Sequence, residues 1–294
     1  MPPIPTRVLE AGLVLAWSSG FVGAVLASEA GAIFSVLFWR FALAAALVAP
    51  FALGTLARQP LGTLAGVALS GALAMFGYLA CVIAAVDLGV PPATAAIVTS
   101  LQPLATAALA GPVLGERVGL GQIAGLGRGL SGVTLAVGGS AAPAPMLGYA
   151  LAGLATASIV AASLLAKRAG GGAREGLGLL PTLCLQCAVS ATLFLPLAYL
   201  QGALVPMPDR AFVEAVVWFV ALSTFGAYGL YWACLARTTA TRTASLMYLT
   251  PPVTGLWAWA MFGEAIEPAA VAGFAVCLAG VVLAARPRAA ALRG

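Results

Sequence analysis

Long apolar runs, separated by short polar, glycine-rich or proline-rich stretches, follow one another along nearly the whole chain. A helix needs about 20 mostly apolar residues to cross a bilayer. The runs predict ten membrane-spanning helices, at residues 8–28, 32–54, 61–86, 91–111, 119–138, 146–167, 175–200, 211–235, 240–262 and 268–286. The predicted fold class is therefore all-α integral membrane.

One segment of the chain occurs twice, 148 residues apart and without a gap. TAAIVTSLQPLATAALAGPVLGE, residues 94–116, returns as RTASLMYLTPPVTGLWAWAMFGE, residues 242–264, and Pro103 aligns with Pro251. A proline within a helix usually breaks it, but in a membrane neighbouring helices can satisfy the freed carbonyl. Interrupted helices at matching places in two halves point to a transporter binding site. Two packing helices with harmless kinks would show the same pattern.

The distribution of charge orients the predicted helices. With the N-terminus in the cytoplasm, eleven of the 14 basic residues fall on the inner side, as the positive-inside rule requires. Because each half has five helices, an odd number, the two halves cross the membrane in opposite senses. We therefore predict two inverted five-helix repeats, residues 1–140 and 146–294, joined at residues 141–145, with both termini in the cytoplasm.

Composition excludes several classes of function. The chain is 62% hydrophobic and 8% charged, with a mean hydropathy of +1.05 and no histidine. Without histidine or an acidic pair inside a span, we expect neither an enzyme nor a metal or cofactor site. Cys184 and Cys187 form a CxxC with no second thiol pair, so we interpret them as packing residues. The basic residues sit singly, which argues against nucleic acid, and no polar ring or carbonyl filter indicates a channel.

A mildly polar stripe lies beside the proline in both copies of the repeated segment. Thr99 and Gln102 share one helical face, and the 148-residue offset moves that face onto Met247 and Thr250. Interhelical hydrogen bonds, about 0.6 kcal/mol each, would explain the stripe, but its coincidence with the proline favours a cavity. With aromatic and hydroxyl side chains near mid-depth of other spans, the predicted substrate site is Trp17, Ser18, Tyr78, Thr99, Gln102, Thr156, Tyr228, Met247 and Thr250.

Small residues predict close packing between the fifth and tenth spans. The fifth span carries an overlapping GxxxG run at Gly121, Gly125 and Gly129, and the tenth carries Gly273 and Gly280. Glycines at this spacing let two helix backbones approach closely.

Two arginines fall within predicted spans. Arg40 lies nearer the outer end of the second span, and we interpret it as structural. Arg128 lies near the middle of the fifth span without an obvious carboxylate partner. Its guanidinium either extends toward the membrane interface or is bound by protein carbonyls.

Several of these motifs resemble a known superfamily. LQPLATAALAGPVLGE, AWSSGFVGA in the first span and FWRFALAAAL in the second resemble the drug/metabolite transporter superfamily, EamA type. The resemblance covers nearly the whole chain and is greatest to the YddG branch of amino-acid exporters. It implies ten helices, cytoplasmic termini, a central cavity lined by spans 1, 3, 4, 6, 8 and 9, and export of small metabolites. Spans 4 and 9 carry no lysine, unlike the superfamily's sugar-phosphate carriers, which argues against phosphorylated cargo.

We therefore expect an inner-membrane secondary transporter that exports small neutral metabolites, above all neutral or aromatic amino acids, by alternating access. Export of other small metabolites or drugs is the alternative, and a membrane protein without transport activity is a third. The expected partners are a small-molecule substrate and the lipid bilayer. We expect a monomer rather than an obligate dimer.

Overall fold

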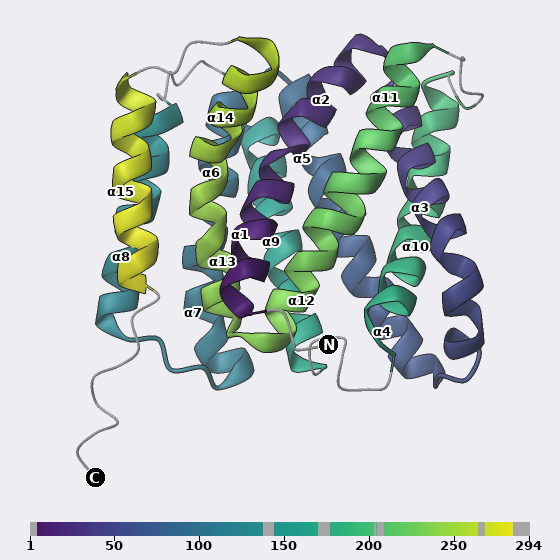
Figure 1. The fold of residues 1–294 in the computed structure, drawn as a ribbon, viewed down its shortest axis with the longest axis horizontal. Coiled ribbons are helices and arrows are strands. Elements are labelled where there is room, and N and C mark those ends of the chain that lie inside the picture. Colours follow the sequence, from purple (N-terminus) through teal and green to yellow (C-terminus); the bar gives the residue numbers. More distant parts are fainter. Residues whose placement is uncertain are drawn as a thin grey trace.

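The computed structural model describes residues 5–137, 144–169, 177–202, 204, 209–263 and 268–284. Within these ranges the chain forms helices and no strand, and the long helices stand side by side as one bundle (Figure 1). Seven stretches are long and apolar enough to cross a membrane: Thr6–Glu29, Ile33–Leu56, Leu61–Asp87, Thr94–Leu114, Met146–Arg168, Leu179–Leu200 and Arg210–Arg237. The predicted all-α membrane fold is confirmed. We call the end of the bundle where α1 begins the inner end, following the predicted orientation.

The uninterrupted helices coincide with expected spans 2, 5, 6, 7 and 10. They are α3 (Ile33–Leu56), α8 (Leu120–Val137), α9 (Met146–Arg168), α10 (Leu179–Leu200) and α15 (Pro268–Ala284). Neither α8 nor α15 is among the seven long apolar stretches, nor is expected span 9. The count of ten spans therefore stays a prediction.

Expected spans 1, 3, 4, 8 and 9 are interrupted helices. Span 1 divides into α1 (Thr6–Ser18) and α2 (Gly20–Glu29), and span 4 into α6 (Pro92–Thr99) and α7 (Gln102–Leu114). Span 3 consists of α4 (Leu61–Gly71), the π-helix η1 (Ala72–Gly77) and α5 (Tyr78–Asp87). Span 8 consists of α11 (Arg210–Trp218), the π-helix η2 (Phe219–Tyr228) and α12 (Gly229–Arg237). Span 9 consists of α13 (Ala240–Ser245), the 3₁₀ turn η3 (Leu246–Leu249) and α14 (Thr250–Phe262). All five belong to the six spans that the family resemblance assigns to the cavity.

The repeated segment is broken at the predicted place in both copies. In the first, α6 ends at Thr99 and α7 starts at Gln102, with Pro103 as its second residue. In the second, η3 precedes Thr250 and Pro251 in the same way. Because proline has no N–H, it cannot donate to the carbonyl one turn earlier, so the break falls just before it.

The two copies also end alike. Gly115 and Gly263 follow α7 and α14 with φ of 70° and 69°, a left-handed conformation that closes a helix and favours glycine. In the second copy the Thr250 hydroxyl donates to the carbonyl oxygen of Met247 at 2.7 Å. A side chain thus supplies a hydrogen bond that the proline cannot.

Helices α8 and α15 pack against each other at one edge of the bundle, on the left in Figure 1. A Cβ added at Gly125 would lie 2.6 Å from the backbone nitrogen of Ala284, and one at Gly132 would lie 2.6 Å from that of Cys277. A Cβ at Gly121 would meet nothing within 4 Å. The predicted close packing is therefore present, but Gly121 takes no part in it and Gly132 does.

The joint predicted at residues 141–145 lies outside the described residues except for its last two. Ala144 and Pro145 are described and lead into α9.

Candidate functional site

Three aromatic rings meet where the interrupted spans converge. The ring of Trp17 in α1 lies 5.3 Å from that of Tyr228 and 5.2 Å from that of Tyr231. The Tyr231 hydroxyl lies 2.6 Å from Ser163 Oγ and accepts a hydrogen bond from Gln102 Nε2 at 3.3 Å. One polar and aromatic cluster thus joins spans 1, 4, 6 and 8, and these five residues are called the central cluster below.

The third span joins the central cluster through a contact between the two π-helices. Tyr228, the last residue of η2, donates its hydroxyl to the carbonyl oxygen of Ala74 in η1 at 2.8 Å. One residue after η1, the Tyr78 side chain lies beside that of Thr99, at the break of span 4. π-Helical turns are rare within α-helices, and those that occur often lie at functional sites. The contact between two of them beside the central cluster therefore indicates that this region is functional.

The break in span 1 lies against the break in span 9. Ser18 Oγ donates to the carbonyl oxygen of Thr250 at 3.1 Å, and Thr254 Oγ1 donates to that of Ser18 at 3.4 Å. The Trp257 indole N–H donates to the carbonyl oxygen of Leu15 at 3.2 Å. Side chains of each span therefore satisfy backbone groups of the other, as irregular backbone in a membrane requires.

The nine predicted site residues lie in this region. They form small groups of contacting residues. Trp17, Tyr228 and Gln102 belong to the central cluster, Tyr78 lies beside Thr99, and Ser18 contacts Thr250. Thr156 Oγ1 donates to the carbonyl oxygen of Val98 at 3.2 Å, one residue before Thr99, and Met247 is buried one turn before Pro251. Trp17, Tyr78, Thr99 and Thr250 are partly exposed, and the other five are buried. That these residues bind a substrate stays a prediction.

The predicted set lacked two members of the central cluster. Tyr231 is 0% exposed and Ser163 1%, and they lie 68 residues apart in the sequence. The three-residue spacing of Tyr228 and Tyr231 on one helix was the available signal. The seven-residue spacing of Thr156 and Ser163, which places both on one helical face, was the signal for Ser163.

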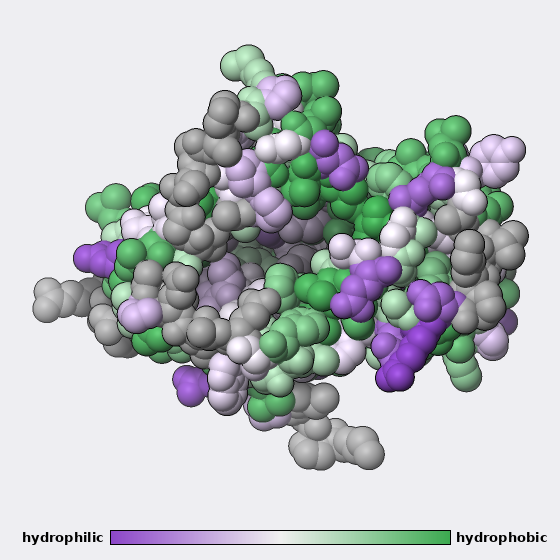
Figure 2. All heavy atoms as spheres, turned by 90° about the horizontal axis from the view of Figure 1, so that it is seen from above, coloured by the Kyte–Doolittle hydropathy of each residue, from purple (hydrophilic) through white to green (hydrophobic). Residues whose placement is uncertain are grey.

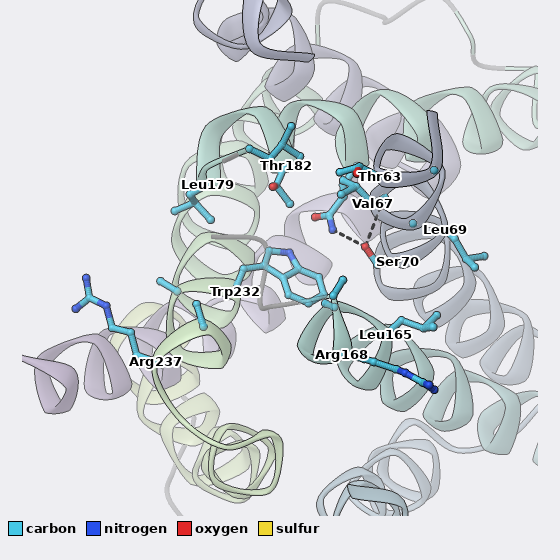
Figure 3. Close-up of a pocket in the computed structure, with 18 residues that line it drawn as sticks. Thr63, Val67, Leu69, Ser70, Leu165, Arg168, Leu179, Thr182, Trp232 and Arg237 are labelled. Carbon is cyan, nitrogen blue, oxygen red and sulfur yellow. Dashed lines mark hydrogen bonds between the residues drawn. The ribbon is translucent and has the colours of Figure 1, made fainter. Parts of the chain in front are cut away.

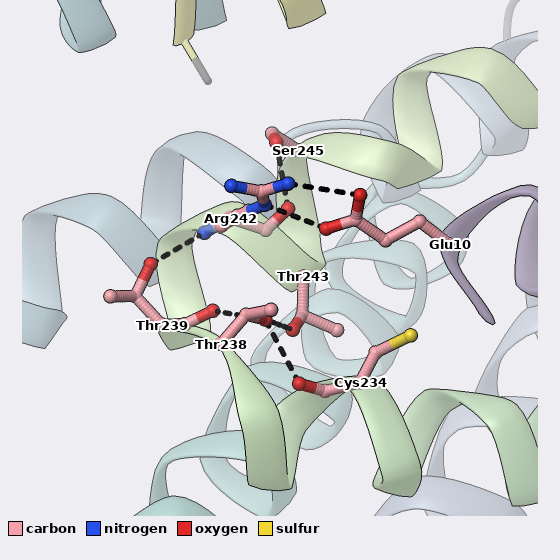
Figure 4. Close-up of polar contacts among 7 residues, drawn as sticks. All are labelled: Glu10, Cys234, Thr238, Thr239, Arg242, Thr243 and Ser245. Atoms are coloured by element: carbon pink, nitrogen blue, oxygen red, sulfur yellow. Dashed lines mark hydrogen bonds and ion pairs between the residues drawn. The ribbon is translucent and has the colours of Figure 1, made fainter. Parts of the chain in front are cut away.

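The two ends of the bundle differ. At the end opposite to the start of α1, the surface is hollowed near its middle, and weakly polar residues lie in the hollow (Figure 2). At the inner end, Arg242 Nε donates to Glu10 Oε1 at 2.6 Å and Arg242 Nη2 to Glu10 Oε2 at 3.0 Å (Figure 4). This ion pair fastens α1 to α13.

A second carboxylate holds the same end of span 9. Glu116, just after α7, accepts a hydrogen bond from the backbone N–H of Ala240 at 2.8 Å and from the Thr241 hydroxyl at 3.1 Å. The first N–H groups of a helix lack partners within it and favour a negative charge. Spans 1, 4 and 9 are therefore joined at the inner end.

A separate cavity of about 650 Å³ lies between α4, α9, α10 and α12 (Figure 3). Its walls are mostly apolar, and Gln186 Nε2 donates to Ser70 Oγ at 3.0 Å at one side. None of the nine predicted site residues lines it. It adjoins the central cluster, because the ring of Trp232 in its wall lies 5.3 Å from that of Tyr231.

The described residues contain no group of three or more His, Cys, Asp and Glu side chains that could hold a metal ion. Cys184 and Cys187, the CxxC pair, are free thiols buried in α10. Their burial among apolar residues is what packing side chains require.

Helices broken in the membrane around a shared polar cluster define a multi-pass membrane protein of the transporter class. The chain belongs to the EamA-like transporter family, whose profile matches residues 8–138 and again residues 146–286. The expected resemblance is thus confirmed, and membership implies a small-molecule substrate and a membrane environment.

Two individual proteins resemble the chain along most of its length. The chain is 29% identical over 284 residues to a "Probable terminal-alkyne amino-acid exporter" of Streptantibioticus cattleyicolor, covering 92% of this chain and 90% of that protein. It also resembles a solved crystal structure at a TM-score of 0.79 and 22% identity, covering 95% of this chain and 97% of the other. At that identity the likeness shows the fold alone.

Proposed function

We propose that the protein exports small neutral metabolites, above all neutral amino acids, across the inner membrane by alternating access. The observation that carries this proposal is the convergence of interrupted spans 1, 3, 4, 8 and 9 on the polar and aromatic groups around the central cluster. Export of an amino-acid cargo by the Streptantibioticus relative supports the choice of substrate class.

The chemistry of the central cluster suits a zwitterion with an apolar side chain. The rings of Trp17, Tyr228 and Tyr231 offer apolar faces that also attract a cation. Gln102 and Thr99 offer hydrogen bonds, and carbonyls beside the helix breaks accept from an ammonium group. Cargo with a net charge would need a counter-charge in this apolar setting.

The difference between the two ends supports alternating access. The outer end is hollowed, while the Glu10–Arg242 pair and the Glu116 contacts join helices at the inner end. We infer that the protein alternates between this arrangement and one in which the inner contacts separate. It acts as a monomer, with both termini in the cytoplasm.

Counterflow exchange tests the proposal. Purified protein is placed in liposomes loaded with unlabelled L-phenylalanine, and entry of trace labelled L-phenylalanine is followed. A carrier gives a transient accumulation that empty liposomes and a Trp17→Ala variant lack. A channel would only equilibrate the label, and a membrane enzyme would change it chemically.

The alternative cargo classes are tested in the same assay. Unlabelled neutral amino acids, charged amino acids and unrelated drugs are added outside as competitors. Competition by neutral amino acids alone supports the proposal. If L-phenylalanine shows no counterflow, or if only unrelated drugs compete, the amino-acid function is wrong.

A further inference from the structure

We propose that Arg40 forms a carboxylate-binding subsite beside the central cluster. This inference rests on the proposed function and names the group that recognises the acid end of the cargo. Arg40 is 2% exposed, and its Nε donates to Thr224 Oγ1 at 2.8 Å. Thr224 lies near the middle of the stretch Arg210–Arg237. Arg40 lies nearer the outer end of α3, as expected, and its guanidinium extends from there to Thr224 at mid-depth.

The charge of Arg40 is not neutralised by the part of the chain that the structure describes. Neither of the ion pairs found there includes Arg40. Its Nε–H bonds to Thr224, but within the same residues the N–H groups of Nη1 and Nη2 have no hydrogen-bond acceptor. A charged group inside a membrane protein is costly, and such groups usually bind a partner or mark a substrate pathway.

Aromatic rings surround the cation without replacing an anion. The rings of Phe41 and Phe219 each lie 4.6 Å from the Arg40 guanidinium carbon, and the Tyr228 ring lies 6.0 Å from it. Ring faces stabilise a cation but accept no strong in-plane hydrogen bonds. The rings therefore leave the N–H groups of Nη1 and Nη2 without a hydrogen-bond acceptor.

The position of Arg40 links it to the central cluster through one shared wall. Tyr228 lies 5.3 Å from Trp17, ring to ring, and also borders the Arg40 guanidinium. A ligand whose side chain packs on Trp17 can thus extend along Tyr228 toward Arg40.

The geometry of a guanidinium selects the class of ligand. Its planar fork matches a carboxylate through two parallel hydrogen bonds. The Thr224 hydroxyl accepts from Nε, which leaves the N–H groups of Nη1 and Nη2 as the two donors of the fork. One guanidinium balances the single charge of a carboxylate, and the apolar rings offer nothing for the second charge of a phosphate.

Binding of three related probes tests the subsite. L-Phenylalanine carries both charged groups, 3-phenylpropionate carries the carboxylate alone, and L-phenylalaninamide carries the ammonium alone. Dissociation constants are measured by titration calorimetry on purified protein in nanodiscs. We expect Arg40→Gln to weaken the two carboxylate probes by about 10- to 100-fold, the loss of a charge-assisted pair, and the amide by less than about twofold.

Arg128→Gln is the matched control, because Arg128 lies in a helix of the same bundle with an exposed side chain. It should leave all three constants unchanged. If Arg40→Gln does not fold, Arg40→Lys keeps the charge but loses the fork, and it should weaken only the carboxylate probes, by several-fold.

The outcomes separate this inference from the proposed function. If L-phenylalanine binds wild type and Arg40→Gln equally, or if all three probes weaken alike, the subsite is wrong and the exporter proposal stands. If 3-phenylpropionate binds in an Arg40-dependent way but L-phenylalanine does not bind, the subsite stands and the amino-acid function is wrong. If wild type binds none of the probes, both are wrong.

Discussion

Glu10 and Arg242, 232 residues apart in the sequence, form a two-point ion pair at the inner end of the bundle. The Glu10 side chain is 11% exposed and that of Arg242 38%. Two parallel hydrogen bonds from a guanidinium to a carboxylate fix the orientation of both groups. The pair is therefore more than a surface contact, and in the proposed alternating-access cycle the inward-open state must break it.

The first prediction concerns the Glu10–Arg242 ion pair. Glu10→Gln removes the charge and should favour opening at the inner end, by about 1–2 kcal/mol or about 5- to 30-fold in population. In a background without native cysteines, a Thr243→Cys probe, buried beside Arg242, reports the opening. Its labelling by an impermeant thiol reagent in inside-out vesicles should accelerate by about that factor.

Glu214→Gln is the matched control for this experiment. It removes the carboxylate of the exposed Arg210–Glu214 pair, whose two atoms lie 2.7 Å apart, and should not change the labelling rate. The charge reversal Glu10→Arg with Arg242→Glu should restore slow labelling. Equal labelling in wild type and Glu10→Gln would mean that the pair does not hold the inner end closed.

The second prediction concerns the break in span 4. Thr99 is partly exposed beside Tyr78. The larger side chain of Thr99→Trp should therefore occupy the predicted substrate site. Counterflow should fall below about a tenth of wild type, while expression and the size-exclusion profile stay normal. Ser131→Trp, at an exposed position of α8, is the control. If it abolishes counterflow equally, the polar stripe has no special role.

The third prediction concerns the contact between α8 and α15. Gly132→Ala should destabilise the purified protein by about 1–3 kcal/mol, because the new Cβ would overlap the Cys277 backbone at 2.6 Å. Gly127→Ala, in the same helix with nothing within 4 Å, should be neutral or slightly stabilising. Thermal unfolding of both variants measures the difference. Equal melting temperatures would contradict the close packing.

Local chain chemistry explains why much of this fold could be predicted. The length of the apolar runs predicts membrane helices, and Pro103 and Pro251 predict where two of them break, because a missing N–H acts at its own position. Gly115 and Gly263 mark the helix ends for an equally local reason. None of these inferences requires knowing which helices are neighbours.

Long-range partners could not be predicted in the same way. Tyr231 meets Gln102 across 129 residues and Ser163 across 68, and only the packed bundle brings them together. The contact between Arg40 and Thr224, 184 residues away, could not be predicted for the same reason. The π-helices in spans 3 and 8 also left no signal in the apolar pattern.

The fourth prediction concerns topology. A cysteine introduced at Ala144, in the joint between the repeats, should react with an impermeant thiol reagent added outside intact cells. A cysteine at Ala169, next to the basic end of α9, should react only after permeabilisation. Native cysteines are replaced beforehand. The opposite pattern would contradict the cytoplasmic termini and the orientation assumed for both ends.

The last prediction concerns the energy source. A proton-coupled carrier needs a titratable group in its pathway that can lose and gain a proton during the cycle. In the described part of spans 1, 3, 4, 6, 8 and 9, the carboxylates nearest the pathway are Glu10, paired with Arg242, and Asp87, exposed at the end of α5. Neither lies at the central cluster. We therefore predict that an imposed pH gradient changes the initial rate of L-phenylalanine uptake into proteoliposomes by less than about twofold. Accumulation against the cargo gradient that a protonophore abolishes, and that Glu10→Gln also abolishes, would instead identify Glu10 as a coupling carboxylate.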